Sequence, residues 1–268
     1  MSQLWAGSPE SYNNVAVAKA KLTARMNSNS DLAREKPPVP YQLVGDVGVV
    51  SVKGSLIAGS AGWMQLYGVT GYDDINAAIL QAVQDQGAKS IMFDVDSPGG
   101  SVSGIDSPLG LIRNLKGVKP TNVFTSSMGS AAFWIGSAAG HITAERFAQV
   151  GSVGAVATVR NIAKYLEDAG IKYEVIRSDP GKMAVTPYEE LTDDARADLE
   201  AMVQQVRDMF VADLATNTGL TASYITKNFG AGKSFLAEEA LSRKMIHAVG
   251  DYSAALAKSK RLGEAKKK

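Results

Sequence analysis

Strand-like and helix-like segments alternate from about residue 47 to residue 177, and this alternation limits the fold more than any other feature. The segment Val47–Ile57 is rich in β-branched residues and is bounded by glycines, which predicts a strand or a hairpin. Residues 72–87 then carry apolar side chains at helical spacing, with Gly87 as the expected stop. Ser90–Val95 follows as a short buried strand. This rhythm predicts an α/β domain with a largely parallel sheet.

Later segments continue the same rhythm. Four further strands are predicted at NVFT (122–125), HITA (141–144), GAVATV (154–159) and KYEVIR (172–177). Three further helices are predicted near Ile105–Leu115, Ala131–Ala139 and Asn161–Ala169. A long amphipathic helix should run from about Thr192 to Thr216. Its apolar face is expected to consist of Leu199, Met202, Val206, Met209, Phe210 and Leu214.

The two ends of the chain differ from this middle. A helix-like segment near Val15–Met26 is followed by a polar stretch with paired prolines, which is typical of an arm or linker. From Asp251 the chain is rich in alanine and lysine, and we expect a solvated, frayed tail, with a docking arm for an acidic partner as the alternative. The expected parts are therefore an arm at 1–40, a main domain at 41–250 and a basic tail at 251–268.

Composition excludes several kinds of chemistry. The 268 residues include no cysteine, so disulfides, thiolate metal sites and a cysteine nucleophile are impossible. The formal charge of +1 gives no electrostatic reason to expect nucleic acid as a partner. No window approaches the roughly 18 to 20 apolar residues of a membrane span, and the N-terminus lacks the basic-then-apolar order of a signal peptide. We therefore expect a cytoplasmic protein without a membrane span.

Histidine is scarce, which limits both metal binding and base catalysis. The two histidines, His141 and His247, are far apart in sequence and lack ligand spacing, so we expect neither a metal site nor a cofactor. Each is expected at the surface or at a strand edge. A Ser-His-Asp triad is possible only if one of them is the base.

The first candidate site is the segment DVDSPGGSVSG from Asp94 to Gly104. A buried strand runs into Pro98, and the two glycines that follow, Gly99 and Gly100, allow unusual backbone conformations and leave N–H groups uncovered. Ligands bind at such strand ends in open α/β sheets. The segment is either a plain tight turn or half of an oxyanion hole, with a backbone N–H directed at a developing negative charge.

The second candidate is Ser130 in the segment SSMGSAAFW. It follows the strand TNVFT and stands at a strand-to-helix turn between the small residues Gly129 and Ala131. This is the geometric principle of a nucleophile elbow, although the G-x-S-x-G pattern itself is not met. The alternative is a serine that merely caps the helix.

A nucleophilic serine needs a base, and the alternative to histidine is a lysine kept neutral by desolvation. Lys182 is the candidate because it stands among prolines and glycine, outside any charged helix face, and is followed by the apolar Met183-Ala184-Val185.

Together these segments resemble peptidase family S49, the signal peptide peptidase A group, over roughly residues 47–250. The resemblance rests on the ordered segments DVDSPGG, SSMGSAAFWIGSAAG, VGSVGAV, IRSDPGKMAVTPYEELTDD and GKSFLAEEALSRKMIHAVG. The residues that match the family's serine, Gly-Ser-x-Gly segment and lysine are Ser130, Ser152 and Lys182. The segments GVTGYDDINAAI (68–79) and TPYEEL (186–191) are most similar to the capsid-assembly (prohead) proteases of tailed phages.

The resemblance implies an α/β fold of the crotonase-like, ClpP-like kind, with repeated ββα units and a long C-terminal amphipathic helix. It implies a Ser–Lys dyad in which Ser130 attacks, Lys182 is the general base and Ser152 orients it. The implied oxyanion hole is formed by Gly100 and Ala131, next to Gly99. Implied partners are protein or peptide substrates, namely scaffold or capsid proteins, and further copies in a ring or dome, within the procapsid in the host cytoplasm.

Other functions remain open from the sequence. A cytosolic bacterial S49 peptidase would degrade membrane-derived signal peptides. A non-catalytic assembly protein could retain the fold, because fold alone does not give function. A crotonase-type acyl-CoA enzyme is more remote, because it would use similar oxyanion geometry without needing Ser130 and Lys182.

Overall fold

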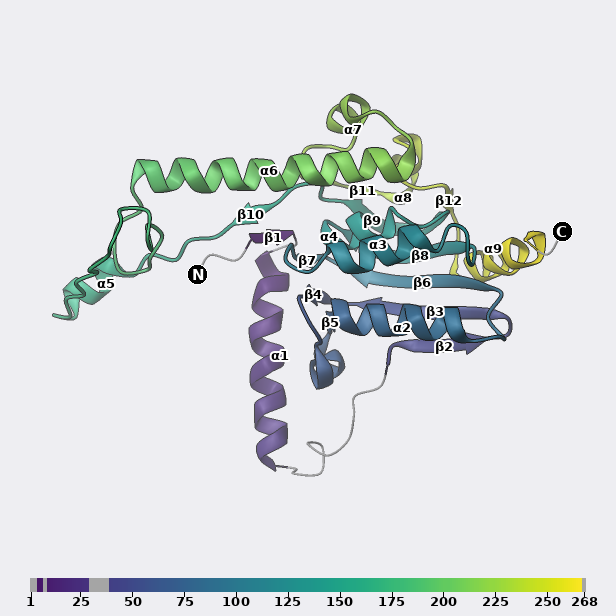
Figure 1. The fold of residues 1–268 in the computed structure, drawn as a ribbon, viewed down its shortest axis with the longest axis horizontal. Coiled ribbons are helices and arrows are strands. Elements are labelled where there is room, and N and C mark those ends of the chain that lie inside the picture. Colours follow the sequence, from purple (N-terminus) through teal and green to yellow (C-terminus); the bar gives the residue numbers. More distant parts are fainter. Residues whose placement is uncertain (1–3, 7–8, 29–38, 267–268) are drawn as a thin grey trace.

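The computed structural model describes residues 4–6, 9–28 and 39–266 (Figure 1). Most of the polar stretch predicted as a linker lies outside the described residues. The described chain forms a two-sheet body from which two long helices extend. One of these helices, α1 (Pro9–Ser28), includes the predicted segment 15–26, and the other is α6 (Asp193–Thr218).

The main sheet confirms the α/β prediction. Its order is β11-β9-β8-β6-β3-β2, with β12 paired to β9, and β3, β6, β8 and β9 run parallel. The bounds are β2 Tyr41–Val44, β3 Val47–Lys53, β6 Ser90–Ser97, β8 Thr121–Gly129, β9 Ile142–Gly151, β11 Ser234–Leu236 and β12 Ala248–Val249. The inner strands are buried almost throughout, as expected for a sheet covered on both faces.

A second, smaller sheet consists of short strands in the order β10-β1-β7-β4-β5. Their bounds are β1 Leu4–Ala6, β4 Ser55–Ile57, β5 Val69–Gly71, β7 Gly100–Ser101 and β10 Val156–Ala157. The prediction of one strand or hairpin at 47–57 was therefore incomplete. The chain turns at Gly54, whose φ is +71°, and passes from β3 in the main sheet to β4 in the second.

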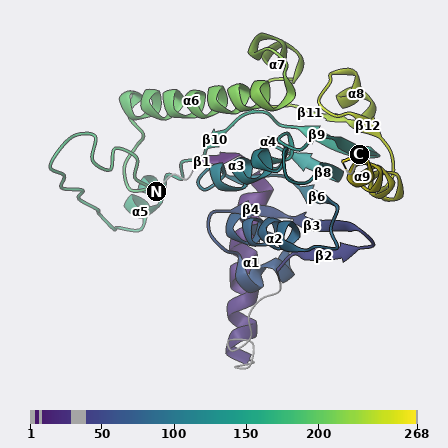
Figure 2. The same ribbon diagram turned by 45° about the vertical axis from the view of Figure 1, so that its right-hand side comes forward.

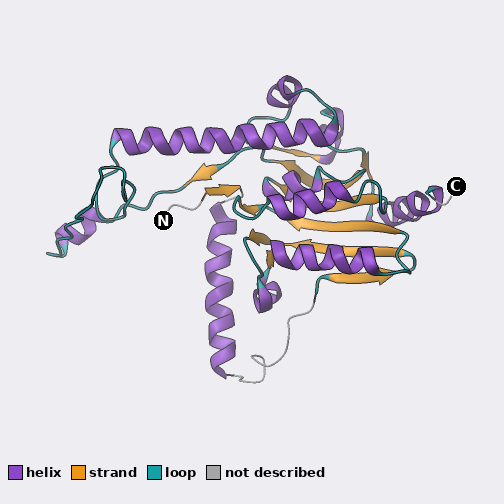
Figure 3. Ribbon diagram, in the orientation of Figure 1, coloured by secondary structure: helices purple, strands orange, loops and turns teal. Residues whose placement is uncertain are grey.

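Strands of the two sheets are followed by helices in a repeated order. The unit β3-β4-β5 leads into α2 (Tyr72–Gln84), and β6-β7 leads into α3 (Asp106–Asn114). Helix α4 (Ala131–Gly136) follows β8 directly. These helices and the sheet share one large core, in which Tyr72, Phe133 and Trp134 are among the largest fully buried side chains. Figure 3 shows the resulting layers of helix and strand.

The expectation of a frayed C-terminal tail was wrong for residues 252–265. They form helix α9 (Tyr252–Ala265), which packs on the main sheet. Ala255 joins a second core cluster with Val49, Met92 and other residues of β3, β6 and β8. Asn122 on β8 donates hydrogen bonds to the Ala255 carbonyl at 2.9 Å and to the Ser259 hydroxyl at 3.1 Å. The buried face of α9 consists of the small residues Ala255, Ser259 and Gly263, and the many lysines around them led to the prediction of a solvated tail.

Residues 158–191 form a lobe at the far end of α6, away from the two sheets (Figures 1 and 2). The lobe contains α5 (Ala163–Asp168) but no strand at 172–177, so that strand prediction was wrong. The predicted strand at 154–159 is reduced to the two residues of β10. The remaining elements are a 3-10 helix at Gly62–Tyr67 and the helices α7 (Ala222–Asn228) and α8 (Ala237–Ser242).

Helix α6 is buried along only part of the predicted face. Val206, Phe210 and Leu214 are buried against the body. Met202 and Met209, which were expected on the same face, are exposed. Met202 belongs to the half of α6 nearest the lobe, which extends beyond the sheets (Figure 1). Met209 lies between the buried Val206 and Phe210 in the chain, so it is exposed because it falls beside the narrow stripe formed by Val206, Phe210 and Leu214.

Candidate active site

Three parallel strands end at the same edge of the main sheet, and the candidate residues follow them. Ser97 on β6 pairs with Met128 on β8, and Gly129 pairs with Gly151 on β9. The residues that come next are the glycine pair, Ser130 with Ala131, and Ser152. We call these residues the serine edge: Gly99, Gly100, Ser130, Ala131 and Ser152. The structure therefore brings together five of the six residues singled out from the sequence.

Ser130 adopts a backbone conformation that few residues other than glycine tolerate. Its φ is +51° and its ψ is −118°, at the junction of β8 and α4. Such a conformation costs about 1–3 kcal/mol and persists only where its surroundings enforce it. Here the Ser130 N–H donates to the Gly151 carbonyl at 2.7 Å, and the Ser130 carbonyl accepts from the Trp134 N–H at 2.8 Å.

The side chain of Ser130 does not cap the helix. Its hydroxyl makes no capping hydrogen bond and lies instead 3.5 Å from the Gly154 carbonyl. The residue is 1% exposed. The capping interpretation is therefore wrong, and a strained turn that holds a serine hydroxyl at a strand end is the geometry of a nucleophile elbow.

The glycine pair is fixed tightly against the second sheet. Gly99 has a φ of +98°, its N–H donates to the Ser97 hydroxyl at 3.1 Å, and its carbonyl accepts from the Leu56 N–H at 3.0 Å. A Cβ on Gly100 would lie 2.0 Å from the Leu56 carbonyl oxygen, so no side chain fits there. The Gly99 N–H is thus engaged by a hydroxyl of its own loop, whereas the Gly100 N–H is directed out of the loop towards the neighbouring strand β1, which favours Gly100 as the candidate oxyanion donor of the pair.

Two further groups complete the serine edge. Ala131 is the first residue of α4, so its N–H lacks a partner within the helix and lies on the turn that carries Ser130. A Cβ on Gly129 would lie 3.1 Å from the Pro98 carbonyl oxygen, so the backbone just before Ser130 closely approaches the backbone just before Gly99. Ser152 has a φ of +56°, and its N–H donates to the Lys233 carbonyl at 2.8 Å.

Lys182 is the one predicted site residue that lies elsewhere. It belongs to the projecting lobe, in a turn where its N–H donates to the Asp179 carbonyl at 2.9 Å. The lobe is closed on itself by the Arg177–Glu189 ion pair and by the stacked rings of Tyr173 and Tyr188, 4.3 Å apart. The Lys182 side chain is exposed, whereas Ser130 is buried. The desolvation required of a neutral lysine is therefore not supplied by the lobe itself.

The two histidines prove to be neighbours. Their rings lie 4.9 Å apart, and the His247 Nδ1 accepts a hydrogen bond from the Ile142 N–H at 3.1 Å. Burial, then the charges of His247 and Lys258, lowers the pKa of His141 to about 4. Burial and the charge of Lys258 also lower the pKa of His247.

Neither histidine can serve Ser130. His141 directly precedes the first residue of β9, and the His247 N–H donates to the carbonyl of that residue, Ile142, at 2.9 Å. Ile142 pairs with Val123 in the first half of β8, whereas Ser130 follows the last residue of that strand. The histidines therefore lie at the amino end of the parallel strands and Ser130 at the carboxyl end, so a Ser-His-Asp triad is not formed.

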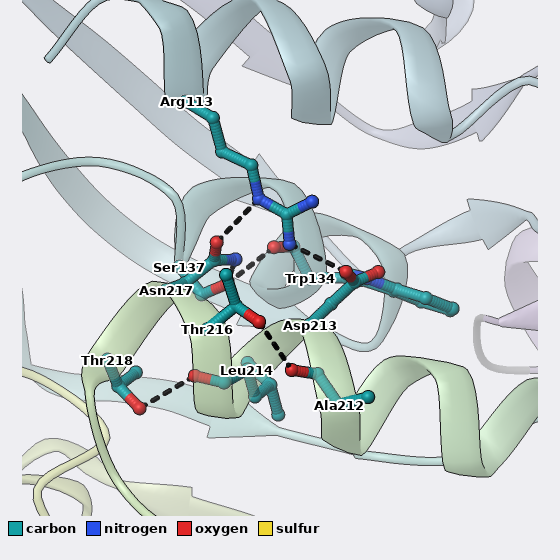
Figure 4. A network of polar contacts seen from close by, with 9 residues as sticks. All are labelled: Arg113, Trp134, Ser137, Ala212, Asp213, Leu214, Thr216, Asn217 and Thr218. Atoms are coloured by element: carbon teal, nitrogen blue, oxygen red, sulfur yellow. Dashed lines mark hydrogen bonds and ion pairs between the residues drawn. The ribbon is translucent and has the colours of Figure 1, made fainter.

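A polar network that the sequence did not reveal joins α3 and α6 to α4, the helix that begins just after Ser130 (Figure 4). Asp213 on α6 accepts from the Arg113 guanidinium at 2.6 Å and from the Trp134 indole N–H at 2.8 Å. Asn217 accepts from Arg113 Nε at 2.7 Å and donates to the Ser137 hydroxyl at 2.7 Å. Trp134 also stacks on Phe210, with ring centroids 4.2 Å apart. Helix α4 is thereby tied to α3 and α6 through Trp134 and through Ser137, which follows its last residue.

The described residues hold no group of three or more histidine, cysteine, aspartate or glutamate side chains arranged to bind a metal ion. Nor does any helix within the described ranges have the length and apolar character of a membrane span.

Comparisons with known proteins agree on a family. The model of peptidase family S49 matches residues 113–266, more than half of the chain. Capsid assembly protease C of Escherichia phage lambda is 28% identical over 216 residues, covering 80% of this chain and 49% of that protein. Head-tail preconnector protein GP5 of Enterobacteria phage P21 is 29% identical over 218 residues, covering 80% and 43%. The chain thus spans about half the length of the curated relatives it matches.

Similar solved structures include a ClpP1 variant from Listeria monocytogenes, 15% identical, which covers 77% of this chain and 94% of that one with a TM-score of 0.46. Another is a protein from Acinetobacter baumannii assigned as an enoyl-CoA hydratase/isomerase, 13% identical, which covers 84% of this chain and 80% of that one with a TM-score of 0.45. The ββα units and the helix-covered parallel sheet agree with the crotonase-like, ClpP-like fold that the resemblance implies.

Proposed function

The chain belongs to peptidase family S49, and from this premise we propose that it is a serine endopeptidase that processes scaffold and capsid proteins during phage head assembly. The observation that carries the enzymatic part is the strained, positive-φ backbone of Ser130 beside the glycine pair. Strain of this kind is retained at functional sites and has no other evident use here, since the hydroxyl does not cap α4. The phage role is supported by the similarity to the lambda and P21 proteins.

In the proposed mechanism the Ser130 hydroxyl attacks a peptide carbonyl while its proton passes to the neutral amine of Lys182. The new C–O bond creates a tetrahedral oxyanion, which the N–H groups of Gly100 and Ala131 stabilise by about 3 kcal/mol per donor. When the C–N bond breaks, Lys182 returns the proton to the leaving amine. Water then hydrolyses the ester, with Lys182 again accepting and returning a proton, and Ser130 is regenerated. In this mechanism the Ser152 hydroxyl orients Lys182.

A Ser130–Lys182 dyad requires the lobe of some copy of the chain to cover the serine edge. The lobe exposes an unusual number of large apolar side chains, and Ile176 is 95% exposed. The others are Tyr165, Ile171, Tyr173 and Met183. Exposed apolar side chains gathered in one lobe favour a protein interface there, and covering the lobe would also desolvate Lys182. We therefore expect a homo-oligomer, of the ring or dome kind, in which the lysine of one copy serves the serine of its neighbour.

Subunit mixing tests the dyad. Ser130→Ala and Lys182→Ala should each abolish proteolysis without changing fold or oligomer size. Lys172→Ala is the matched control, because Lys172 lies on the same lobe with its side chain exposed and forms an ion pair with the exposed Glu174 at 2.9 Å. Mixed assemblies of the two inactive variants should regain part of the activity. Normal cleavage by Lys182→Ala would show that another group is the base, and an inactive mixture would show that the lysine is not supplied by a neighbour.

The phage role is tested with a substrate. Purified chain is incubated with a candidate scaffold protein, and the cut sites are mapped by mass spectrometry with Ser130→Ala as control. Discrete cuts that are absent from the control are expected. An intact scaffold, under conditions where a generic unfolded protein is cut, would favour a peptidase of another role, and no cleavage of either would favour a non-catalytic assembly protein.

A further inference from the structure

The N-terminal strand β1 lies between β7, which begins at Gly100 of the serine edge, and β10, which begins four residues after Ser152. It pairs antiparallel with β7, which begins at Gly100, and antiparallel with β10, which follows the Ser152–Gly154 segment. Without β1 the second sheet would be interrupted, since among the described strands β10 and β7 are joined through β1. Residues 4–6 thus fill a slot one strand wide, and the rest of the sheet supplies its two walls.

The register of this strand relates it to the proposed chemistry. Trp5 lies opposite Ser101, Ala6 lies opposite Gly100, and the Val102 N–H donates to the Leu4 carbonyl at 3.3 Å. Hydrogen-bonded pairs alternate along an antiparallel ladder, so the next such pair after Leu4 with Val102 is Ala6 with Gly100. The carbonyl of Ala6 therefore faces the N–H of Gly100, which is the proposed oxyanion donor. A peptide bound for cleavage would present its reacting carbonyl to the same N–H.

The strand is anchored by helix α1. Trp5 is 5% exposed, its indole N–H donates to the Ser11 hydroxyl at 2.8 Å, and its ring meets that of Tyr12 edge-on at 5.4 Å. The Ser55 hydroxyl on β4 donates to the Ser11 carbonyl at 2.9 Å, which ties the start of α1 to the second sheet. A groove of about 760 Å³ runs beside the strand and is lined mainly by apolar side chains, among them Ile57, Val102 and Met202.

We propose that the slot between β7 and β10 is the peptide-binding cleft, and that residues 4–6 occupy it as an intramolecular substrate mimic that holds the subunit closed. This inference rests on the proposed function and identifies its substrate class. The slot takes an extended peptide by strand addition, with a small residue at the position of Ala6 and a large apolar residue just before it. A substrate must displace β1 before it can bind. The apparent affinity of the resting chain for peptide is therefore the affinity of an open slot multiplied by the fraction of subunits whose slot is open.

A binding assay tests this without requiring catalysis. Ser130→Ala is introduced into the full chain, and a fluorescein-labelled peptide with the sequence of residues 2–7 is titrated by fluorescence anisotropy. Trp5→Asp should expel β1, because it places a charge at a buried site. Ala6→Pro should do the same without a charge, because proline cannot donate to the ladder. Both should bind the peptide about tenfold more tightly or better, as expected if β1 fills at least nine slots in ten.

Val17→Asp is the matched control, because it adds the same charge at an exposed position of α1 and should bind the peptide like the parent. Thermal unfolding checks that all variants are folded. Equal peptide affinity in the parent, Trp5→Asp and Ala6→Pro, or binding by none of them, would overturn the proposal. If expelling β1 strengthens peptide binding but variants that retain Ser130 cleave nothing, the slot stands and the proposed function fails. If the variants that retain Ser130 cleave peptides but expelling β1 does not change peptide binding, the proposed function stands and the slot proposal fails.

Discussion

Replacing Asp213 with alanine should loosen the attachment of α6 to the serine turn, and the structure sets the size of the effect. The Trp134 indole N–H, in a residue that is 1% exposed, would lose its acceptor, which costs about 1–3 kcal/mol. Arg113 would lose its ion pair with Asp213, whose side chain is 25% exposed, but would keep Asn217, a loss of about 1 kcal/mol. We expect the free energy of unfolding to fall by about 2–4 kcal/mol.

The assay is urea unfolding followed by tryptophan fluorescence, with the midpoint shifted and the slope m unchanged. Asp213→Asn keeps one oxygen for the indole N–H and should lose about half as much. Asp208→Ala on the same helix is the control: its side chain is 60% exposed and pairs with the adjacent Arg207 at 2.9 Å, so it should lie within about 0.5 kcal/mol of wild type. If Asp213→Ala also lay within that range, the network would not hold α6 as we describe.

Two further predictions concern other parts of the fold. Gly100→Ala should destabilise the protein by at least about 2 kcal/mol and abolish cleavage, because its Cβ would lie 2.0 Å from the Leu56 carbonyl oxygen. Calorimetry measures the stability and a peptidase assay the cleavage. A stable, active variant would refute the tight packing of Gly100 against Leu56. The pKa of His141 is about 4 in the folded chain, below the usual value of 6.5, so the unfolded chain binds the proton more readily and stability falls as the pH drops from about 6.5 towards 4. Because His141 is only half-buried, His141→Gln should reduce the loss between pH 7 and pH 5 by about 1 kcal/mol, measured by urea unfolding at each pH, and an unchanged pH profile would contradict the burial argument.

The sequence predicted those features that local pattern determines. The β-branched runs and the helical spacing placed β6, β8, α2 and α6 correctly, because their own residues carry the periodicity. The segment 172–177 looks like a strand by composition, yet it lies in the lobe, where no neighbouring strand pairs with it. Helix α9 was missed for the opposite reason, since its buried face consists of Ala255, Ser259 and Gly263, which carry little hydrophobic signal.

In the candidate site, too, some residues could be predicted from local sequence patterns and others could not. Ser130 and the glycine pair could be identified because strand ends and small residues have a local signature, and parallel strands then bring them to one edge. The contact between β1 and β7 has no such signature, because residues about 95 positions apart meet through tertiary structure alone. The adjacency of His141 and His247 was likewise hidden by their separation in the chain. Lys182 was expected with these residues but lies in the projecting lobe, and no local pattern in the sequence predicts where that lobe packs.

Covalent labelling shows whether Ser130 is the nucleophile. The purified chain is treated with a serine-reactive phosphonate, and the adduct is located by mass spectrometry of the intact protein and of its peptides. We expect one adduct per subunit on Ser130, none in Ser130→Ala, and undiminished labelling in Ser127→Ala, which alters a neighbouring serine on β8. Labelling that persists in Ser130→Ala, or that falls on another serine of the folded wild-type chain, would show that Ser130 is not the nucleophile.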